Sequence, residues 1–305
     1  MLFANVDRAP PSSSWGIHRE MPPRRVTLDD YERRILRAQK LLEERLEEPV
    51  TPSELAAAAH FSLHHFHRIF RAQLGETVMQ HVRRLRLERA ARRMRSSNER
   101  LLAIAIDAGY ESHEAFTRAF VERFGISPSS YRAQPSTRLA AWERRRDDHP
   151  RAEVSVRTLP TRRVAYRRHR GGYATIHDFW ARLMSWAGER GLADRPAPFF
   201  GLCPDDPEVT AEEHLRFDAC VLVGSEFVPD ASVVMGEIPG GLYAVGVHVG
   251  PFDRLAETYL DVIGRWFPTS GYDLAPEAVV EHYLDDPAKV PPEELRTEVC
   301  VRIAE

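Results

Sequence analysis

Four histidines lie within eight residues of the stretch HFSLHHFHRIFR, residues 60–71. On a helix, residues three or four positions apart share a face, so His60, His64 and His67 would lie together. Imidazole nitrogens are common ligands of zinc and nickel. Such a site would need a carboxylate or a further histidine, because no cysteine lies within a hundred residues. The residues leave two interpretations open: a metal site, or a helix that contacts something else.

The chain around these histidines is typical of two short helices joined by a tight turn. Thr51 and Glu54 form a capping-box pair with a proline between them, which predicts a helix start. Ser62 offers a second cap, and Gly75 a helix end. Apolar residues at helical spacing face inward on the second helix. Its outer face comprises His64, His67, Arg68 and Arg71. This pattern predicts a helix-turn-helix.

A second copy of the pattern lies 50 residues further on, at residues 101–132. The capping serine, the inward phenylalanines, one arginine and the terminal glycine recur. Ser62, Phe66, Arg68, Phe70 and Gly75 correspond to Ser112, Phe116, Arg118, Phe120 and Gly125. At the places of three histidines, the second copy has Glu114, Ala115 and Thr117. A repeat that keeps its packing and varies its outer face predicts two readers of different base pairs.

Residues 77–97 join the two copies and carry seven arginines between positions 83 and 95. A helix of this length spans roughly 30 Å, close to the ~34 Å of one DNA turn. We expect it to place the two reading helices in successive major grooves. Some of its arginines are expected to touch phosphate.

Residues 27–132 resemble the DNA-binding domain of AraC/XylS transcription regulators. The stretch GYESHEAFTRAFVERFGISPSSYR is similar to that family's second helix-turn-helix signature almost throughout. The resemblance implies that both reading helices contact bases, for which arginine suits guanine and glutamate suits cytosine. With Arg71 from the basic face, the expected DNA-binding residues are Leu63, His64, His67, Arg68, Arg71, His113, Glu114, Thr117 and Arg118. His60 and His65 are then expected in turn or packing positions.

The charge of the chain is unevenly distributed. Residues 1–150 carry 26 Lys and Arg against 20 Asp and Glu, hence +6, and residues 151–305 carry 16 against 25, hence -9. No apolar run reaches the ~18 residues of a membrane span, and residues 1–26 read as a disordered tail without a signal-peptide core. Three cysteines without a CxxC motif indicate reduced thiols, so a cytoplasmic protein is expected.

The acidic half contains a different repeat. DDPEVTAEEHLRFDACVLV, from residue 205, matches DDPAKVPPEELRTEVCVRI, from residue 285, at a shift of 80. Each unit predicts strand, helix, strand, strand, and two such units would join about a pseudo-two-fold axis. The expected fold is an all-α double helix-turn-helix domain over 27–133, a linker over 134–152, and an α+β domain of two pseudo-symmetric units over 153–305.

Residues 153–305 resemble the GyrI-like effector-binding domain, and the domain order is similar to that of Rob regulators. The repeat breaks its symmetry where Gly201 stands in place of Glu281, which suggests room on one face and an acid on the other. The resemblance implies that this acid lines a pocket for cationic, aromatic ligands. The expected effector-binding residues are Glu281, Tyr283, Tyr173, Trp180, Phe199, Tyr259 and Trp266. Alternatively, Glu281 lies on the solvated side of its strand and the aromatic residues form core.

These patterns predict a sequence-specific DNA-binding transcription regulator, an activator, whose second domain binds a small cationic or aromatic effector. RNA polymerase is a further expected partner. No catalytic residue, cofactor or metal is expected, and the protein is not expected to be an enzyme. In one alternative, Glu281 and Tyr283 hydrolyse a small electrophile. In another, the acidic half only contacts protein partners.

Overall fold

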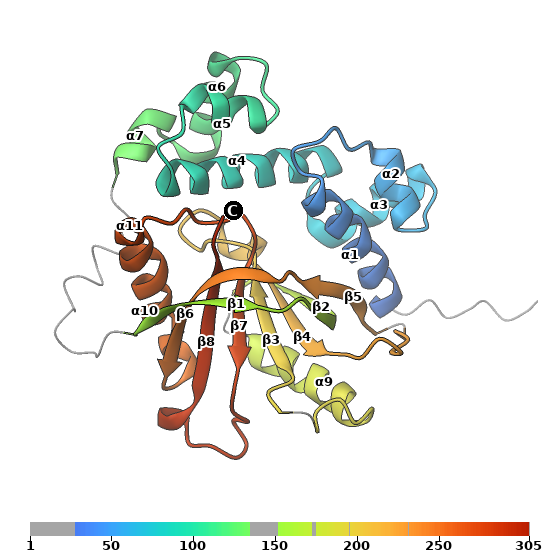
Figure 1. The fold of residues 1–305 in the computed structure, drawn as a ribbon. Helices are drawn as coiled ribbons and strands as arrows, with labels where there is room; N and C mark the ends of the chain where they lie inside the picture. The colour runs from blue at the N-terminus through green and yellow to red at the C-terminus, as the bar shows by residue number, and fades with distance from the viewer. Residues whose placement is uncertain (1–27, 135–151, 173–174, 195, 231, 305) are drawn as a thin grey trace, which may run out of the picture.

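The computed structural model describes residues 28–134, 152–172, 175–194, 196–230 and 232–304. The predicted tail at 1–26, nearly all of the predicted linker at 134–152, and Tyr173 lie outside the described residues. The first part of the described chain is helical, and the second combines a sheet with helices (Figure 1). The expected two-domain layout is therefore confirmed.

The helical part begins with one long helix, continues through a short pair, and repeats that pair after a second long helix. Its helices are α1 (Leu28–Glu44), α2 (Pro52–Ala58), α3 (Leu63–Leu74), α4 (Val78–Ser96), α5 (Leu101–Asp107), α6 (His113–Phe124) and α7 (Pro128–Ala133). Capping boxes at Thr51 and Thr77 fix the starts of α2 and α4. Gly75 and Gly125 end α3 and α6 at φ 73° and 76°, which glycine adopts without strain.

Two hydrophobic clusters hold the helix-turn-helix units, and α4 contributes to both. Phe66 and Phe70 of α3 pack with α1 and with the first half of α4. Phe116 and Phe120 of α6 pack with α7 and with the second half of α4. One continuous helix thus packs against both units (Figure 1).

The second part contains one eight-stranded antiparallel sheet in the order β1-β6-β8-β7-β3-β4-β2-β5. Its strands are β1 (Val154–Leu159), β2 (Arg162–Arg170), β3 (Phe199–Cys203), β4 (Arg216–Leu222), β5 (Val234–Ile238), β6 (Gly241–Val249), β7 (Val279–Tyr283) and β8 (Arg296–Arg302). Helix α9 (Ile176–Gly188) follows β2. After β6 come α10 (Leu255–Tyr259), a π-helical segment (Leu260–Trp266) and α11 (Phe267–Ser270).

The predicted strand-helix-strand-strand units are present, but each has one more strand in front. β1 and β5 lie 80 residues apart, so they belong to the repeat. Each pairs with the other unit, β1 with β6 and β5 with β2. The sequence did not reveal them because VSVRTL and VMGEIP share only their first residue.

The two faces of the sheet have different neighbours. Ala165, Phe217 and Ala219 face α9. Val164 and Tyr166 point to the opposite face, where Leu36 of α1 joins their cluster. The helical part therefore packs against the face that α9 leaves open.

Two glycines at helix ends allow a matched test of backbone conformation. A Cβ at Gly125 or at Gly188 meets no atom within 4 Å, so packing is not changed in either case. We expect Gly125→Ala to destabilise the fold by about 1 kcal/mol, because Gly125 is left-handed. Gly188→Ala should instead stabilise it slightly, because α9 is helical there. Thermal unfolding of the full chain measures both; equal midpoints for the two variants would contradict this account.

Candidate functional site

The candidate DNA-reading residues lie on the outer faces of α3 and α6. Eight of the nine are exposed, and Thr117 is half-buried. Ser62 and Ser112 cap the two helices, each accepting a hydrogen bond from a backbone amide three residues on. Inward packing of the phenylalanines fixes the rotation of each helix, so the same positions face outward in both units.

The histidine cluster is divided between different environments. His64 and His67 are exposed on the outer face of α3. His60 lies in the turn before it at φ 53°, and its carbonyl accepts a hydrogen bond from Arg34. The ring of His65 lies edge-on to Phe61, with 5.7 Å between centroids. His60 thus lies in the expected turn and His65 contacts Phe61, but both side chains are exposed, like those of His64 and His67. Among the described residues, no His, Cys, Asp and Glu side chains form a group of three suited to a metal ion.

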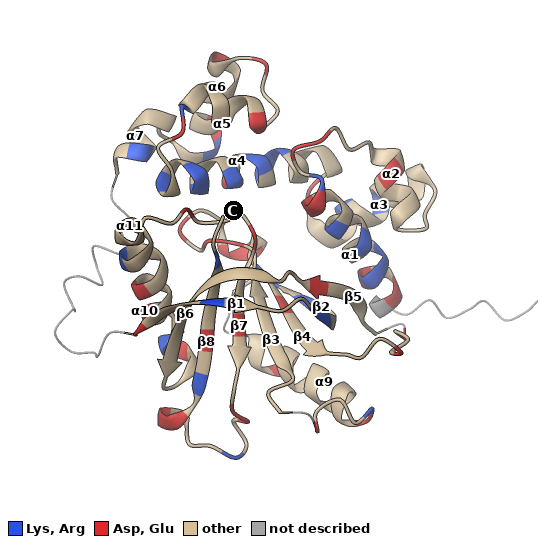
Figure 2. Ribbon diagram, in the orientation of Figure 1, with Lys and Arg blue, Asp and Glu red and all other residues tan. Residues whose placement is uncertain are grey.

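The arginine run of α4 shows as blue segments along that helix (Figure 2), and its expected phosphate contacts stay a prediction. Each of its seven arginines contacts another part of this chain. Arg83 pairs with Glu122, Arg84 with Glu76 and Glu88, Arg86 with the carbonyls of Leu46 and Glu48, Arg89 with Glu47, Arg92 with the carbonyl of Pro204, Arg93 with Glu99 and Asp107, and Arg95 with Glu208. Arg92 and Arg95 reach the loop between β3 and β4, so α4 also joins the two parts of the molecule.

The candidate effector site centres on Glu281 of β7, which is 7% exposed. Its Oε1 accepts a hydrogen bond from the Tyr259 hydroxyl at 2.7 Å and one from Cys203 Sγ at 3.5 Å. Its Oε2 accepts one from the Tyr283 hydroxyl. The residue is therefore buried, which contradicts the alternative of a solvated Glu281. No lysine or arginine in the described part of the chain pairs with it.

The three donors around Glu281 keep their protons. Burial, with the adjacent carboxylate, raises the pKa of the Tyr259 and Tyr283 hydroxyls well above the ordinary tyrosine value. The same causes raise the pKa of the Cys203 thiol. The carboxylate is thus held by neutral groups, whose hydrogen bonds offset part of its desolvation but supply no opposite charge.

Aromatic rings cover this carboxylate. Trp180 lies edge-on to Tyr283 at 5.2 Å and to Phe217 at 5.9 Å between centroids. Phe199 lies 6.1 Å from Trp180, and Phe252, which is 40% exposed, lies 5.5 Å from Tyr283. The cluster formed by Glu281, Tyr259, Tyr283, Cys203, Trp180 and Phe217 is called the Glu281 cluster below.

The room expected beside Gly201 is occupied. A Cβ placed on Gly201 would lie 2.6 Å from Cζ of Phe217 and 2.8 Å from the Tyr283 hydroxyl. The glycine thus admits a protein ring where the sequence suggested space for a ligand. Phe217 and Cys203 were not among the predicted residues. At the position of Phe217 the second unit has Thr297, which is too small to fill the same space. This difference between the units is the sequence signal that could have identified Phe217.

Of the predicted effector residues that the structure describes, Phe199 adjoins the Glu281 cluster at Trp180, and Trp266 lies outside it. Trp266 stacks on Tyr272 with ring centroids 5.9 Å apart, and lies edge-on to Phe267. Tyr173 is outside the described residues.

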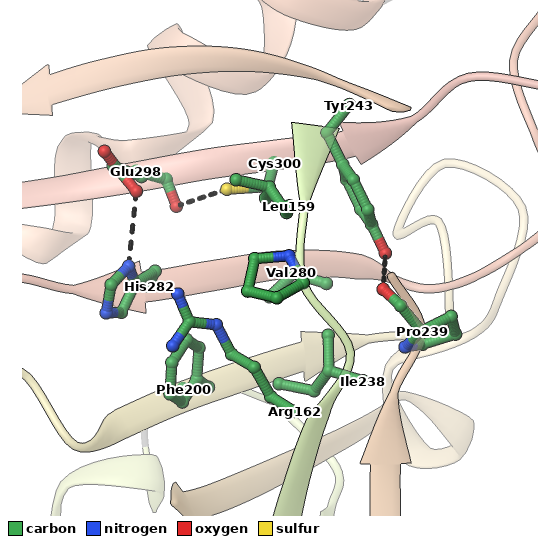
Figure 3. A pocket seen from close by; sticks show the side chains of 11 residues that line it. Leu159, Arg162, Phe200, Ile238, Pro239, Tyr243, Val280, His282, Glu298 and Cys300 are labelled. Atoms are coloured by element: carbon green, nitrogen blue, oxygen red, sulfur yellow. Dashed lines mark hydrogen bonds and ion pairs between the residues drawn. The ribbon is translucent and has the colours of Figure 1, made fainter. Parts of the chain in front are cut away.

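A separate hollow lies on the opposite face of the sheet (Figure 3). His282 stacks on Phe200 at 4.4 Å between centroids, and its Nδ1 lies 3.2 Å from Glu298. Arg162 lies over the same phenylalanine ring. The cavity holds about 20 Å³, enough for roughly one water molecule. It is too small for an organic effector.

Comparisons with known proteins cover both parts of the chain. A family model described as a GyrI-like small molecule binding domain matches residues 152–304, and one for a helix-turn-helix domain matches residues 55–134. "Probable transcriptional regulator YgiV" of Escherichia coli K12 is 35% identical over 155 residues, which are 50% of this chain and 96% of that protein. "Multiple antibiotic resistance protein MarA" of the same organism is 30% identical over 91 residues, covering 30% of this chain and 72% of that protein.

One solved structure, described as a hydrolase from Listeria innocua, covers 53% of this chain and 97% of its own. It is 17% identical with a TM-score of 0.36, too distant to inform the chemistry of this chain. None of the described helices is both long and apolar enough to cross a membrane.

Burial of the cysteines gives a direct test of the site. Cys203, Cys220 and Cys300 are buried and free, and burial raises the pKa of each thiol. At pH 8 these groups are therefore protonated and poor nucleophiles. We expect no fast reaction with Ellman's reagent in the folded protein and three equivalents in guanidinium. Rapid labelling of Cys203 without denaturant would contradict the packing around Glu281.

Proposed function

The chain belongs to the AraC-type transcription regulators with a C-terminal GyrI-like small-molecule binding domain, and on that premise we propose that an organic cation, bound at Glu281, changes its DNA binding. The proposed domain limits are 27–133 for DNA binding and 153–305 for the effector. The protein is proposed to be a cytoplasmic activator, with RNA polymerase as its further partner. The observation that carries the proposal is a buried carboxylate with neutral donors and no cation among the described residues.

Charge compensation is the reason to expect a cation. A carboxylate removed from water is destabilised unless it gains a counter-charge or protonates. An organic cation supplies the charge, and the faces of Trp180 and Tyr283 would add cation–π contacts of about 0.5–2 kcal/mol each. Inorganic cations would lose more hydration on entering such a site, which offsets what they gain from these rings. An aromatic or alkylated ammonium or phosphonium is the ligand class that fits.

Binding requires the Glu281 cluster to open. Phe217 and the Tyr283 hydroxyl fill the space beside Gly201, and Trp180 packs on both residues. A ligand would have to displace at least one of these rings, and Phe252 lies at the exposed side of Tyr283. The free energy of opening would lower the apparent affinity in proportion to the open fraction. The ligand would thereby drive a change in packing, as a regulatory site requires.

The same packing supports a binding role over hydrolysis. General-base catalysis needs a water molecule held at the carboxylate. Here both carboxylate oxygens already accept protein hydrogen bonds. The named relatives are a probable transcriptional regulator and a multiple antibiotic resistance protein. Binding without turnover is therefore the proposed chemistry.

Thermal unfolding of the full chain with tetraphenylphosphonium tests the effector site. Tetraphenylborate is the control ligand, because it has the same shape and the opposite charge. We expect the cation, and not the anion, to raise the unfolding midpoint. At 100 times its Kd the cation should add about 2.7 kcal/mol to the free energy of unfolding. Glu281→Gln should abolish the rise, while Glu237→Gln, an exposed change in the same domain, should keep it. Equal shifts with both ions, or a shift that survives in Glu281→Gln, would refute the proposal, and recovery of altered ligand would favour hydrolysis.

The DNA-reading residues are proposed from their exposure and their place on α3 and α6. Duplexes selected by the wild-type protein from a random pool provide the ligand. We expect Arg118→Ala to weaken binding about 5- to 150-fold, the 1–3 kcal/mol of one bidentate base contact, and to relax the preference at one base pair. Arg182→Ala, an exposed change on α9, should leave affinity unaltered. Unchanged affinity and preference in Arg118→Ala would remove α6 as a reading helix.

A further inference from the structure

Glu43, the penultimate residue of α1, joins the two domains through buried charge. Its Oε1 accepts a hydrogen bond from Arg216 Nη1 at 2.6 Å, and its Oε2 one from Arg168 Nη2 at 3.0 Å. Both arginine side chains are 5% exposed. Burial opposes ionisation of Glu43, but the two guanidinium groups hold its pKa at about 2. The carboxylate is therefore charged, and removing it would leave buried guanidinium N–H groups of Arg168 and Arg216 without these acceptors.

The two arginines are anchored on the sheet by further carboxylates. Arg168 of β2 donates to Asp218 of β4 at 2.6 and 2.8 Å. Arg216 donates to Asp205 through Nε at 2.8 Å and through Nη2. The position of Glu43 thus depends on the relative position of β2, β4 and Asp205 in the loop after β3.

The internal repeat shows that this contact is specific to one unit. Arg296 and Asp285, the counterparts of Arg216 and Asp205, form the same pair, with Nε to Oδ2 at 2.9 Å. The side chain of Arg296 is nevertheless 55% exposed, and within the described residues its ion pair is with Asp285 of the same unit. Where the first unit has Arg168, the second has Val247, which is exposed. The arginine–aspartate pair is thus common to both units, and in the first unit the arginine also donates a hydrogen bond to Glu43.

Strand β4 connects this charge network to the Glu281 cluster. Side chains alternate between the two faces of a strand, so Arg216 and Asp218 point to Glu43 while Phe217 points to Trp180. Displacement of the Phe217 ring would therefore act on the backbone that carries both charged residues.

The DNA-binding domain is held at two separate places. Helix α1 shares a core with Phe66 and Phe70, so it carries the first reading helix. Arg95 pairs with Glu208, and Val209 packs into the core of the second helix-turn-helix unit. A shift at the first anchor alone would alter how the two reading helices are set relative to each other.

We propose that Glu43 is a positioning residue that couples the packing of the Glu281 cluster to DNA affinity, through Arg168, Arg216 and β4. This coupling would transmit the response to the proposed effector to the DNA-binding domain. Its biological role therefore rests on the proposed function. The route itself is a property of the chain and can be tested without any effector.

Gly201→Ala provides a perturbation of the Glu281 cluster from within. Its added methyl group would push on Phe217 and Tyr283, and the substitution removes no charged side chain. Affinity for a duplex selected by the wild-type protein is measured for four proteins: wild type, Gly201→Ala, Glu43→Gln and the double variant. We expect Gly201→Ala to change Kd about fivefold or more with Glu43 present, and less than about twofold with Glu43→Gln. A uniform loss of stability would change Kd by the same factor in both backgrounds, so it would not produce this difference between the two fold-changes.

Glu44→Gln is the matched control, since it makes the same change on the next residue, whose side chain is 58% exposed. The effect of Gly201→Ala should persist in that background. Circular dichroism checks folding, and Phe217→Leu replaces Gly201→Ala if the alanine variant does not fold. An equal change in Kd with and without Glu43, or no change in either background, would overturn the proposal. Failure of tetraphenylphosphonium to bind would instead refute the effector assignment and leave this coupling standing.

Discussion

A carboxylate withdrawn from water must be compensated, and the half-buried Glu43 and the buried Glu281 meet this constraint in different ways. Glu43 has two guanidinium groups, which fix α1 on the sheet. Glu281 has two phenols and a thiol, which satisfy its hydrogen bonds without neutralising it. Two guanidinium partners suit a joint between domains, because breaking it would leave buried guanidinium N–H groups without these acceptors. Incomplete compensation suits a site that awaits a charged ligand.

Both domains are built from internal repeats, and in both the asymmetry carries the proposed function. The helix-turn-helix units keep their caps and phenylalanines and differ on their outer faces. The sheet units keep the Arg216–Asp205 type of pair and differ at Gly201, where the second unit has Glu281. Gly201 and Glu281 are register partners on adjacent central strands, so the difference falls on the pseudo-two-fold axis itself. A single cluster results there, not two equivalent ones.

Much of this architecture followed from local patterns. Caps predicted the helix starts, and shifts of 50 and 80 predicted the repeats, because capping and packing residues recur at fixed spacing. What the sequence did not show depends on distant partners. The arginines of α4 appeared free until Glu208 and Pro204 were placed beside them. Gly201 suggested a space because the ring that fills it, Phe217, comes from another strand. Glu43 is one of many glutamates in α1 and beyond, and nothing local distinguishes it.

The exchange of first strands between the two sheet units has a consequence for the order in which the two domains fold during synthesis. β1 must wait for β6, nearly ninety residues later, before it has a pairing partner. The helix-turn-helix units close mainly through contacts near in sequence, which form fast. Since domains fold as units from the N-terminus during synthesis, the DNA-binding domain leaves the ribosome and folds first. A nascent chain therefore possesses its proposed DNA-reading surface before it possesses the domain that we propose regulates it.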